Sequence, residues 1–285
     1  MKATSLSINL FGGCNARCPF CIASATWKTG IRSNKALLDS VPRALYYAKY
    51  HGVDTVLITG SGEPTLQRTA VLKILQQCNV EKIPITELQT NGEILAKDSS
   101  YLDDLKKNGL NTIAISIASI DEKKSAQLMA IDYDYTTLAK RAFDSGFVCR
   151  ISLNMTAIDR NALLGSLPET VDSMRSRGVH QLTLRELGIP AVTQPTKEAK
   201  EKIEWIRDNA LPRDDVRTII KQIEDGGVLL RRLSYGAAVY DYRGLSVCVA
   251  SCLTEKSDPN EIRSLILMPD GHVYHSWNYR GSILL

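Results

Sequence analysis

Residues 12–24 read "GGCNARCPFCIAS" and place three thiols within eight positions of one another. The thiols belong to Cys14, Cys18 and Cys21. The run "SLSINL" at residues 5–10 precedes them and alternates polar with apolar side chains, as a strand with one buried face does. The sequence therefore predicts a strand that leads directly into a cysteine-rich loop.

The number of thiols limits the kind of metal site. A closed tetrahedral zinc site needs four ligands, and the nearest histidine, His51, lies beyond a predicted helix. Three thiolates can instead bind three irons of a cubane cluster and leave the fourth iron without a protein ligand. Such an iron can take up another molecule, as the open position of catalytic zinc does. A zinc loop, a structural cluster loop and three buried free thiols are the alternatives.

Farther along the chain, short β-rich runs alternate with segments whose apolar residues recur every three or four positions. The further strand candidates are residues 54–60, 83–90, 111–119, 148–156 and 180–187. The helix candidates are residues 36–51, 66–78, 98–109, 135–146 and 163–178. This alternation predicts an α/β fold with a parallel sheet and right-handed crossovers, either open or curled into a barrel.

The pattern changes where two prolines interrupt it near residue 190. Helical stretches at 196–210 and 213–227 follow, and then short antiparallel strand signals with a turn at Asp270-Gly271. We therefore predict a core over residues 1–190 and a helical and β-hairpin extension over residues 191–285, a small α+β part that closes the barrel.

Composition and charge say little about the substrate but bear on the class of protein. The net charge of +4 is far below that of a dedicated nucleic-acid backbone binder, and no apolar run is long enough to span a membrane. The N-terminus lacks the features of a secretory signal. Seven cysteines, an odd number, do not form a typical secreted disulfide framework. We expect a cytoplasmic protein that does not associate with membranes.

The spacing of the thiols is specific. Three residues separate Cys14 from Cys18 and two separate Cys18 from Cys21, with Phe20 directly before the last thiol. This pattern, placed after a first strand, resembles the cluster motif of the radical S-adenosylmethionine (SAM) superfamily. The resemblance implies that the thiolates hold a [4Fe-4S] cluster, that SAM chelates the open iron, and that Phe20 belongs to the cofactor site. It also implies a partial (β/α)6 TIM-like barrel and an electron donor such as flavodoxin or ferredoxin.

Residues 59–65, "TGSGEPT", follow the second predicted strand. They resemble the family's Gly-Gly-Glu-Pro element, with Ser61 in place of the first glycine. The resemblance implies that Gly62 and Glu63 hold the amino group of SAM through the backbone and a carboxylate. Taken alone, the same residues predict a strand-to-helix loop, because glycine permits a close backbone approach and Pro64 stops the strand.

Polar residues also end the next three predicted strands. Thr90 and Asn91 lie in "LQTNG", Ser116 in "ISIAS" and Asn154 in "SLNMT". Ligands of parallel sheets and barrels bind at the carboxyl ends of the strands, so these side chains are expected to face one pocket. Each resembles a family position that contacts the ribose or the methionyl part of SAM. A turn or a helix cap is the alternative role for Asn91.

Arg185 interrupts the otherwise apolar sixth strand candidate. Its guanidinium can form a structural ion pair with Glu186 or another acid, or it can enter the pocket as a carboxylate clamp. In the second case Arg185 is a catalytic-site residue that holds the carboxylate of SAM or an acidic substrate.

The C-terminal part contains two further thiols, Cys248 and Cys252, in "CVASC". Together with the stretch at 268–285 they faintly resemble the end of a SPASM or twitch extension. The thiols that would complete an auxiliary cluster are missing, so we expect an extension without a cluster. Cys248 and Cys252 are then packed, redox-active, or ligands alongside His272 or His275.

The resemblance implies an enzyme that splits SAM reductively and uses the 5′-deoxyadenosyl radical to take hydrogen from a substrate. A small molecule or a nucleotide-like biosynthetic intermediate is the expected substrate, and a nucleic acid or a peptide is not excluded. The enzyme alternatives are an activase that installs a radical on a partner protein, or a peptide-modifying enzyme. A non-catalytic Fe-S or zinc protein that binds or senses is the rival from another class.

Overall fold

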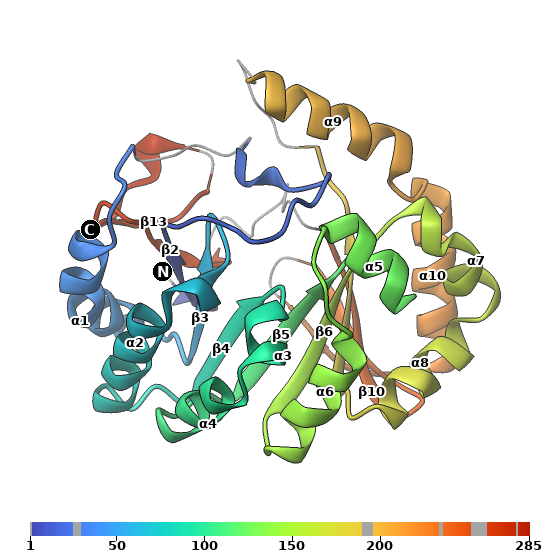
Figure 1. Ribbon diagram of the computed structural model, residues 1–285, viewed down its shortest axis with the longest axis horizontal. Coiled ribbons are helices and arrows are strands. Elements are labelled where there is room, and N and C mark those ends of the chain that lie inside the picture. Colours follow the sequence, from blue (N-terminus) through green and yellow to red (C-terminus); the bar gives the residue numbers. More distant parts are fainter. Residues whose placement is uncertain (1, 25–29, 190–195, 234–235, 252–260, 278) are drawn as a thin grey trace. The chain divides into compact units, whose positions relative to one another are not determined.

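The computed structural model describes residues 2–24, 30–189, 196–233, 236–251, 261–277 and 279–285 (Figure 1). The chain divides into two compact units, each built from separate segments. Unit 1 comprises Met1–Asn15, Thr26–Ala114 and Lys256–Leu285, and unit 2 comprises Ala16–Ala25 and Ile115–Glu255. Both units thus draw on residues before and after position 190, and the division predicted there stays a prediction.

Unit 1 is built on a mainly parallel sheet covered by helices. Its strands, in spatial order, are β13 (Val273–Tyr274), β12 (Leu265–Leu267), β2 (Leu6–Leu10), β3 (Thr55–Gly60) and β4 (Ile85–Thr90). Only β13 runs antiparallel to its neighbour among these pairs. β5 (Thr112–Ile117) begins in this unit, and β1 (Lys2–Ala3) pairs with β11 (Glu261–Ile262). The helices are α1 (Lys35–Tyr50), α2 (Arg68–Val80), α3 (Glu93–Lys97) and α4 (Ser99–Lys107).

Helix α1 shows why the sequence forms these elements. Its buried residues Leu37, Val41, Leu45 and Ala48 recur every three or four positions, so one stripe of the helix is apolar. Figure 1 shows α1 and α2 running alongside each other on one side of β3. The predicted helix at 36–51 is therefore confirmed, with bounds shifted by one residue.

Unit 2 is also a sheet with helices. Its strands, in spatial order, are β6 (Val148–Met155), β7 (Gln181–Glu186), β10 (Leu245–Ser251), β9 (Ala238–Tyr242) and β8 (Val228–Arg232). Its helices are α5 (Glu122–Met129), α6 (Tyr135–Asp144), α7 (Arg160–Gly165), α8 (Leu167–Ser176), α9 (Lys197–Asn209) and α10 (Arg213–Gly226). β9 and β10 form the expected hairpin, and β10 in addition runs parallel to β7.

One helix prediction needs correction, and α3 and α5 were not predicted. The single helix expected at 163–178 is divided into α7 and α8 at Ser166, because Pro168, the second residue of α8, supplies no backbone donor to the turn before it. Helix α5 was not predicted. Its signal was Asp121, whose side chain accepts a hydrogen bond from Lys124 N and caps the helix.

The register of the strands separates a polar from an apolar face. In unit 1 the buried polar residues Ser7 and Asn9 alternate along β2 with fully buried apolar ones, and Asn9 lies beside Thr59 of β3. In unit 2 Asn154 of β6 lies beside Arg185 of β7. Since side chains alternate between the faces of a strand, one face of each sheet can pack in a core while the other presents polar groups. The mainly parallel strand pairings of the two units, together with their helices, confirm the α/β fold class.

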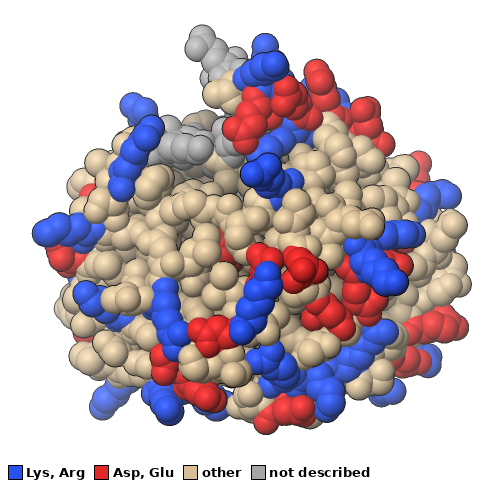
Figure 2. All heavy atoms as spheres, viewed as in Figure 1, with Lys and Arg blue, Asp and Glu red and all other residues tan. Residues whose placement is uncertain are grey.

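Charges of both signs are mixed on the face shown in Figure 2, in keeping with the small net charge. Among the described residues, none of the helices combines the length and the apolar character that a membrane crossing requires.

Candidate cluster and cofactor site

Hydrogen bonds from two side chains hold the backbone at the start of the cysteine loop. Phe11, which follows β2, donates its backbone N–H to Asn34 Oδ1 at 2.8 Å, and Asn34 Nδ2 donates to the carbonyl of Phe11 at 2.8 Å. Gln67 Nε2 donates to the same carbonyl. Two side chains from the starts of α1 and α2 therefore hold the backbone just ahead of Cys14.

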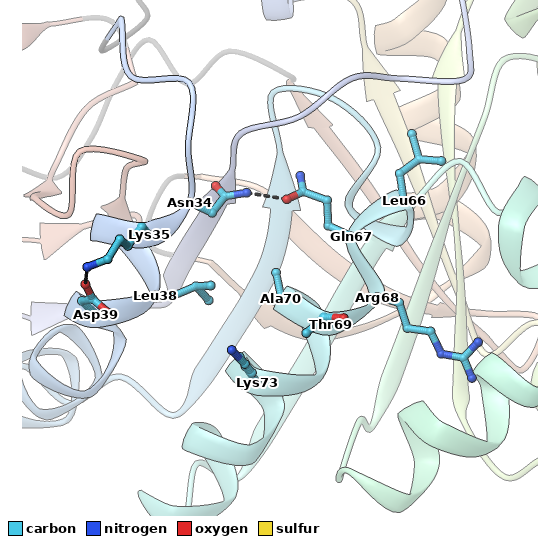
Figure 3. A pocket seen from close by; sticks show the side chains of 10 residues that line it. All are labelled: Asn34, Lys35, Leu38, Asp39, Leu66, Gln67, Arg68, Thr69, Ala70 and Lys73. Carbon is cyan, nitrogen blue, oxygen red and sulfur yellow. Dashed lines mark hydrogen bonds and ion pairs between the residues drawn. The ribbon is translucent and has the colours of Figure 1, made fainter.

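Asn34 and Gln67 also lie at a surface pocket of unit 1 of about 670 Å³. In Figure 3 the two amides point towards each other across it, and Lys35 pairs with Asp39. The pocket is lined by Asn34, Lys35, Leu38, Asp39, Leu66, Gln67, Arg68, Thr69, Ala70 and Lys73. None of the predicted site residues lines this pocket.

Gly62 lets the loop after β3 touch the cysteine loop. A Cβ atom at Gly62 would lie 2.1 Å from the carbonyl oxygen of Gly13 and 2.4 Å from that of Gly12. The next residue, Glu63, donates its N–H to the Gly13 carbonyl at 2.9 Å. Only a residue without a side chain permits this backbone contact. Within unit 1, the structure thus brings the Gly-Glu-Pro element against the residue before Cys14.

The carboxylate of Glu63 is buried, with 3% of the residue exposed, and it joins two loops. Its Oε1 accepts hydrogen bonds from Thr65 N at 3.0 Å, Thr65 Oγ1 at 2.6 Å and Thr90 Oγ1 at 2.6 Å. Its Oε2 accepts from Asn91 N at 2.8 Å. The structure therefore brings Glu63, Thr90 and Asn91 together. That Glu63 contacts SAM stays a prediction.

Asn91 takes part in a turn and also reaches the cysteine loop. Its Oδ1 accepts a hydrogen bond from Glu93 N at 3.1 Å, which is the turn named as one alternative role, whereas the N-cap of α3 is Gly92. Its Nδ2 donates to Asn15 Oδ1 at 2.8 Å and to Cys14 Sγ at 4.0 Å. The cysteine loop is thus linked to the end of β4 by side-chain amides.

Unit 2 holds the other two thiols in a different environment. Arg17 N donates to the carbonyl of Met129 at 2.8 Å, and Cys21 N donates to that of Cys18 at 3.2 Å, so this part of the loop turns tightly. Phe20 is buried with Met129 and Ile206, and Cys18 packs against the same cluster.

Helix α9 supplies part of this packing, which sequence reasoning missed. The ring of Trp205 lies 5.8 Å from that of Phe20, between centroids. Ile203, Ile206 and Ala199 form the buried stripe of α9. That stripe was the signal in the sequence for an apolar face, but nothing in it named the cysteine loop as the partner.

Lys202 lies one turn before Ile206 on α9 and is half-buried. Its Nζ donates to Glu198 Oε1 at 2.8 Å. Burial by itself lowers the pKa of Lys202, but the hydrogen bond to Glu198 and the charges of Cys21 and Cys18 outweigh it and raise the pKa. An ammonium group therefore faces the second half of the cysteine motif.

Three more predicted residues lie in unit 2. Asn154 Nδ2 donates to the carbonyl of Ile117 at 3.4 Å, and Ser116 is half-buried near the end of β5. Arg185, in register with Asn154, donates from Nε to Ser152 Oγ. Among the ion pairs of the described residues, Arg185 has no acidic partner, so its pairing with Glu186 is not found there.

A sequence model described as "Radical SAM superfamily" matches residues 8–161 of this chain, which is more than half of it. The chain belongs to the radical SAM superfamily. It is therefore an enzyme whose cofactors are a [4Fe-4S] cluster and SAM.

Curated relatives match part of this radical SAM chain. The GTP 3′,8-cyclase of Mycolicibacterium smegmatis is 28% identical over 228 residues, which are 77% of this chain and 57% of that protein. The molybdenum cofactor biosynthesis protein moc-5 of Caenorhabditis elegans is 28% identical over 155 residues, 54% of this chain and 25% of that protein. The chain spans about half the length, or less, of the curated relatives it matches.

Solved structures resemble the fold over more of the chain. SuiB of Streptococcus suis bound to S-adenosylmethionine gives a TM-score of 0.67 at 18% identity, over 96% of this chain and 60% of that one. Coproporphyrinogen III oxidase (HemN) of Escherichia coli, described as a radical SAM enzyme, gives 0.51 at 16% identity, over 79% and 53%. This likeness supports the α/β fold class with mainly parallel strands, and the closure of the strands into a partial barrel stays a prediction.

The donor set of the radical SAM motif fits an iron-sulfur cluster. The side chains of Cys14, Cys18 and Cys21 form no disulfide and are exposed or half-buried, and thiolates are the protein ligands of such clusters. Cys14 belongs to unit 1, and Cys18 and Cys21 belong to unit 2. As they stand, no three His, Cys, Asp or Glu side chains of the described residues are gathered around a metal position.

The second pair of thiols predicted from the sequence is only partly described. Cys248 on β10 is half-buried and in register with Thr183 of β7. Cys252 lies outside the described residues. Cys78 and Cys149 are buried in the cores, as expected for thiols within a helix and a strand.

Proposed function

We propose that this radical SAM enzyme cleaves SAM reductively at a cluster held by Cys14, Cys18 and Cys21, and takes hydrogen from a small, anionic, nucleotide-like substrate. The spacing of the three thiols carries the proposal. The relatives named as GTP 3′,8-cyclases support a nucleotide-like substrate. An electron donor such as flavodoxin or ferredoxin is the proposed partner.

When bound, the cluster and SAM supply an electron and a 5′-deoxyadenosyl radical. The chain supplies position and exclusion of water. Gly62, Thr90, Ser116 and Asn154 are proposed to hold SAM from the ends of β3, β4, β5 and β6, because each lies at or near a strand's carboxyl end. Phe20 is proposed as the apolar wall of the cofactor site, since it is buried in the cluster against which Cys18 packs.

Arg185 is the proposed anion-binding group. Its guanidinium has five donors, and one of them bonds the neutral hydroxyl of Ser152. The remaining donors suit a planar carboxylate or a phosphate. Asn154 lies beside it in register and adds an amide donor. This pair supports a substrate, or a SAM carboxylate, that carries negative charge.

The test is anaerobic reconstitution followed by reduction in the presence of SAM and deuterated metabolite pools. The proposal predicts about four irons per chain and 5′-deoxyadenosine that takes deuterium from an anionic small molecule. Deuterium from a partner glycine or a peptide would instead show an activase or a peptide-modifying enzyme. One zinc without cleavage would show a binding or sensing protein.

A matched pair of thiol variants locates the cluster. Cys18→Ala should abolish both iron binding and SAM cleavage, because two thiolates cannot hold the cubane. Cys248→Ala should retain both, since Cys248 lies on β10, outside the motif. Equal loss in the two variants would contradict the proposed ligand set.

A further inference from the structure

The hydrogen bonds of Glu63 show what its carboxylate does within the protein. The carboxylate receives four donors from Thr65, Thr90 and Asn91, three at Oε1 and one at Oε2. Burying a carboxylate is costly unless donors compensate for the lost water. Thr65 lies in the turn after β3, Thr90 is the last residue of β4, and Asn91 follows it. Glu63 therefore holds the turn after β3 and the end of β4 together.

This contact fixes the orientation of Asn91. Its backbone N–H is held by Glu63 Oε2 at 2.8 Å, and its side-chain Oδ1 accepts from Glu93 N at 3.1 Å. Because the side-chain oxygen is occupied by a donor, the amide nitrogen must point the other way. It points to Asn15 Oδ1, at 2.8 Å, and to Cys14 Sγ, at 4.0 Å. Asn15 in turn donates to Glu93 Oε2, which closes the network.

An N–H group aimed at a cysteine sulfur matters for an iron-sulfur cluster. Reduction adds negative charge to the cluster and its sulfurs, and hydrogen bonds to the sulfurs stabilise that charge. We propose that Glu63 is a positioning residue, which holds Asn91 so that its amide donates to Cys14 Sγ and makes the cluster easier to reduce. The inference rests on the proposed ligand role of Cys14 and is independent of the substrate.

The test is a redox titration of the reconstituted protein without SAM, followed by electron paramagnetic resonance. Asn91→Leu keeps the approximate volume and removes the donor. Glu63→Asp keeps the charge but withdraws the carboxylate from Asn91 N and Thr90. Each should lower the ratio of reduced to oxidised cluster at a fixed potential by about fivefold, the size of one net hydrogen bond. The double variant should add little to either single one, because both act through the same bond.

Glu87→Asp is the matched control. Glu87 is a glutamate of β4 that is as deeply buried as Glu63, and it accepts a hydrogen bond from Gln89 at 3.1 Å. It should destabilise the apoprotein and leave the redox ratio unchanged. If Glu63→Asp and Asn91→Leu also lower only the stability or the iron content, and the clusters that do form keep the wild-type ratio, the inference is wrong.

A second substitution at Asn91 keeps the test decisive if the Asn91→Leu protein fails to assemble a cluster. Asn91→Asp is isosteric, keeps the acceptor for Glu93 N, and replaces the donor by a negative charge, so it should lower the redox ratio more than Asn91→Leu. A ratio equal to or above that of the wild type would overturn the inference. If the wild-type protein itself binds no cluster, the proposed function fails first; if it cleaves SAM while the variants titrate identically, only this inference fails.

Discussion

The two parts of the cysteine motif differ in what surrounds them. In unit 1, Cys14 lies beside side-chain amides, with the Nδ2 of Asn91 directed at its sulfur. In unit 2, Cys18 packs against an apolar cluster that contains Phe20 and Ile206. Hydrogen bonds are directional, whereas apolar packing is not. We infer that the first environment orients its thiolate and the second shields its thiolates from water.

The largest expected effect tests the apolar side of this comparison. Phe20→Ala should lower the free energy of unfolding of the apoprotein by about 3 kcal/mol, because it removes a ring that is 8% exposed and leaves a cavity next to Trp205. Urea unfolding followed by circular dichroism measures the change. Tyr46→Ala, at a ring that is 71% exposed, is the control and should stay within about 0.5 kcal/mol. Equal values would show that Phe20 does not anchor the loop.

The next effect tests the backbone contact on the polar side. Gly62→Ala should destabilise the apoprotein by about 1–3 kcal/mol, because the new methyl group would collide with the carbonyls of Gly12 and Gly13. Gly13→Ala is the matched control, since its methyl group would meet nothing within 4 Å. Thermal unfolding of both variants decides the point. A fall in melting temperature for Gly13→Ala as large as that for Gly62→Ala would refute the close approach.

A smaller effect tests whether the charge of Lys202 also influences reduction of the cluster from the side of Cys18 and Cys21. Lys202→Gln removes the ammonium group that faces Cys18 and Cys21, and should lower the ratio of reduced to oxidised cluster about twofold at low salt. The shift should shrink as salt rises, because Lys202 is partly exposed to solvent. Lys200→Gln, on an exposed position of α9, is the control. If Lys202→Gln changed the ratio of reduced to oxidised cluster more than Asn91→Leu does, the environment of Cys18 and Cys21 would influence reduction more strongly than that of Cys14.

Much of the fold could be predicted because local patterns record which side chains are buried. The strand expected at 54–60 is β3 (Thr55–Gly60), and the helix expected at 213–227 is α10 (Arg213–Gly226). The cysteine spacing and "SGEP" likewise lie within short stretches of chain. Each of these features is read from neighbouring residues, so periodicity and spacing are sufficient to find it.

The rest depends on contacts between residues far apart in sequence. Glu63 could be recognised as an acceptor, but its donors Thr90 and Asn91 lie 27 and 28 residues away. Likewise, the apolar stripe of α9 predicted a buried face without naming Phe20 as its partner. Periodicity shows that a face is buried and does not show what covers it. Pairings of this kind require the folded chain.

The last prediction concerns thiols that neither environment contains. Burial raises the pKa of both Cys78 and Cys149 to about 12. At pH 8 only about one molecule in ten thousand then carries the reactive thiolate at either position. Iodoacetamide should therefore leave both thiols unmodified in the native apoprotein, while Cys14, which is exposed, reacts.

Peptide mass mapping after timed alkylation measures this difference, and urea should make Cys78 and Cys149 reactive. If either were alkylated as fast as Cys14 under native conditions, the core around it would open on the timescale of the labelling. Slow labelling at both core positions, combined with fast labelling at Cys14, would show that reactivity follows the environment of each thiol and not its place in the chain.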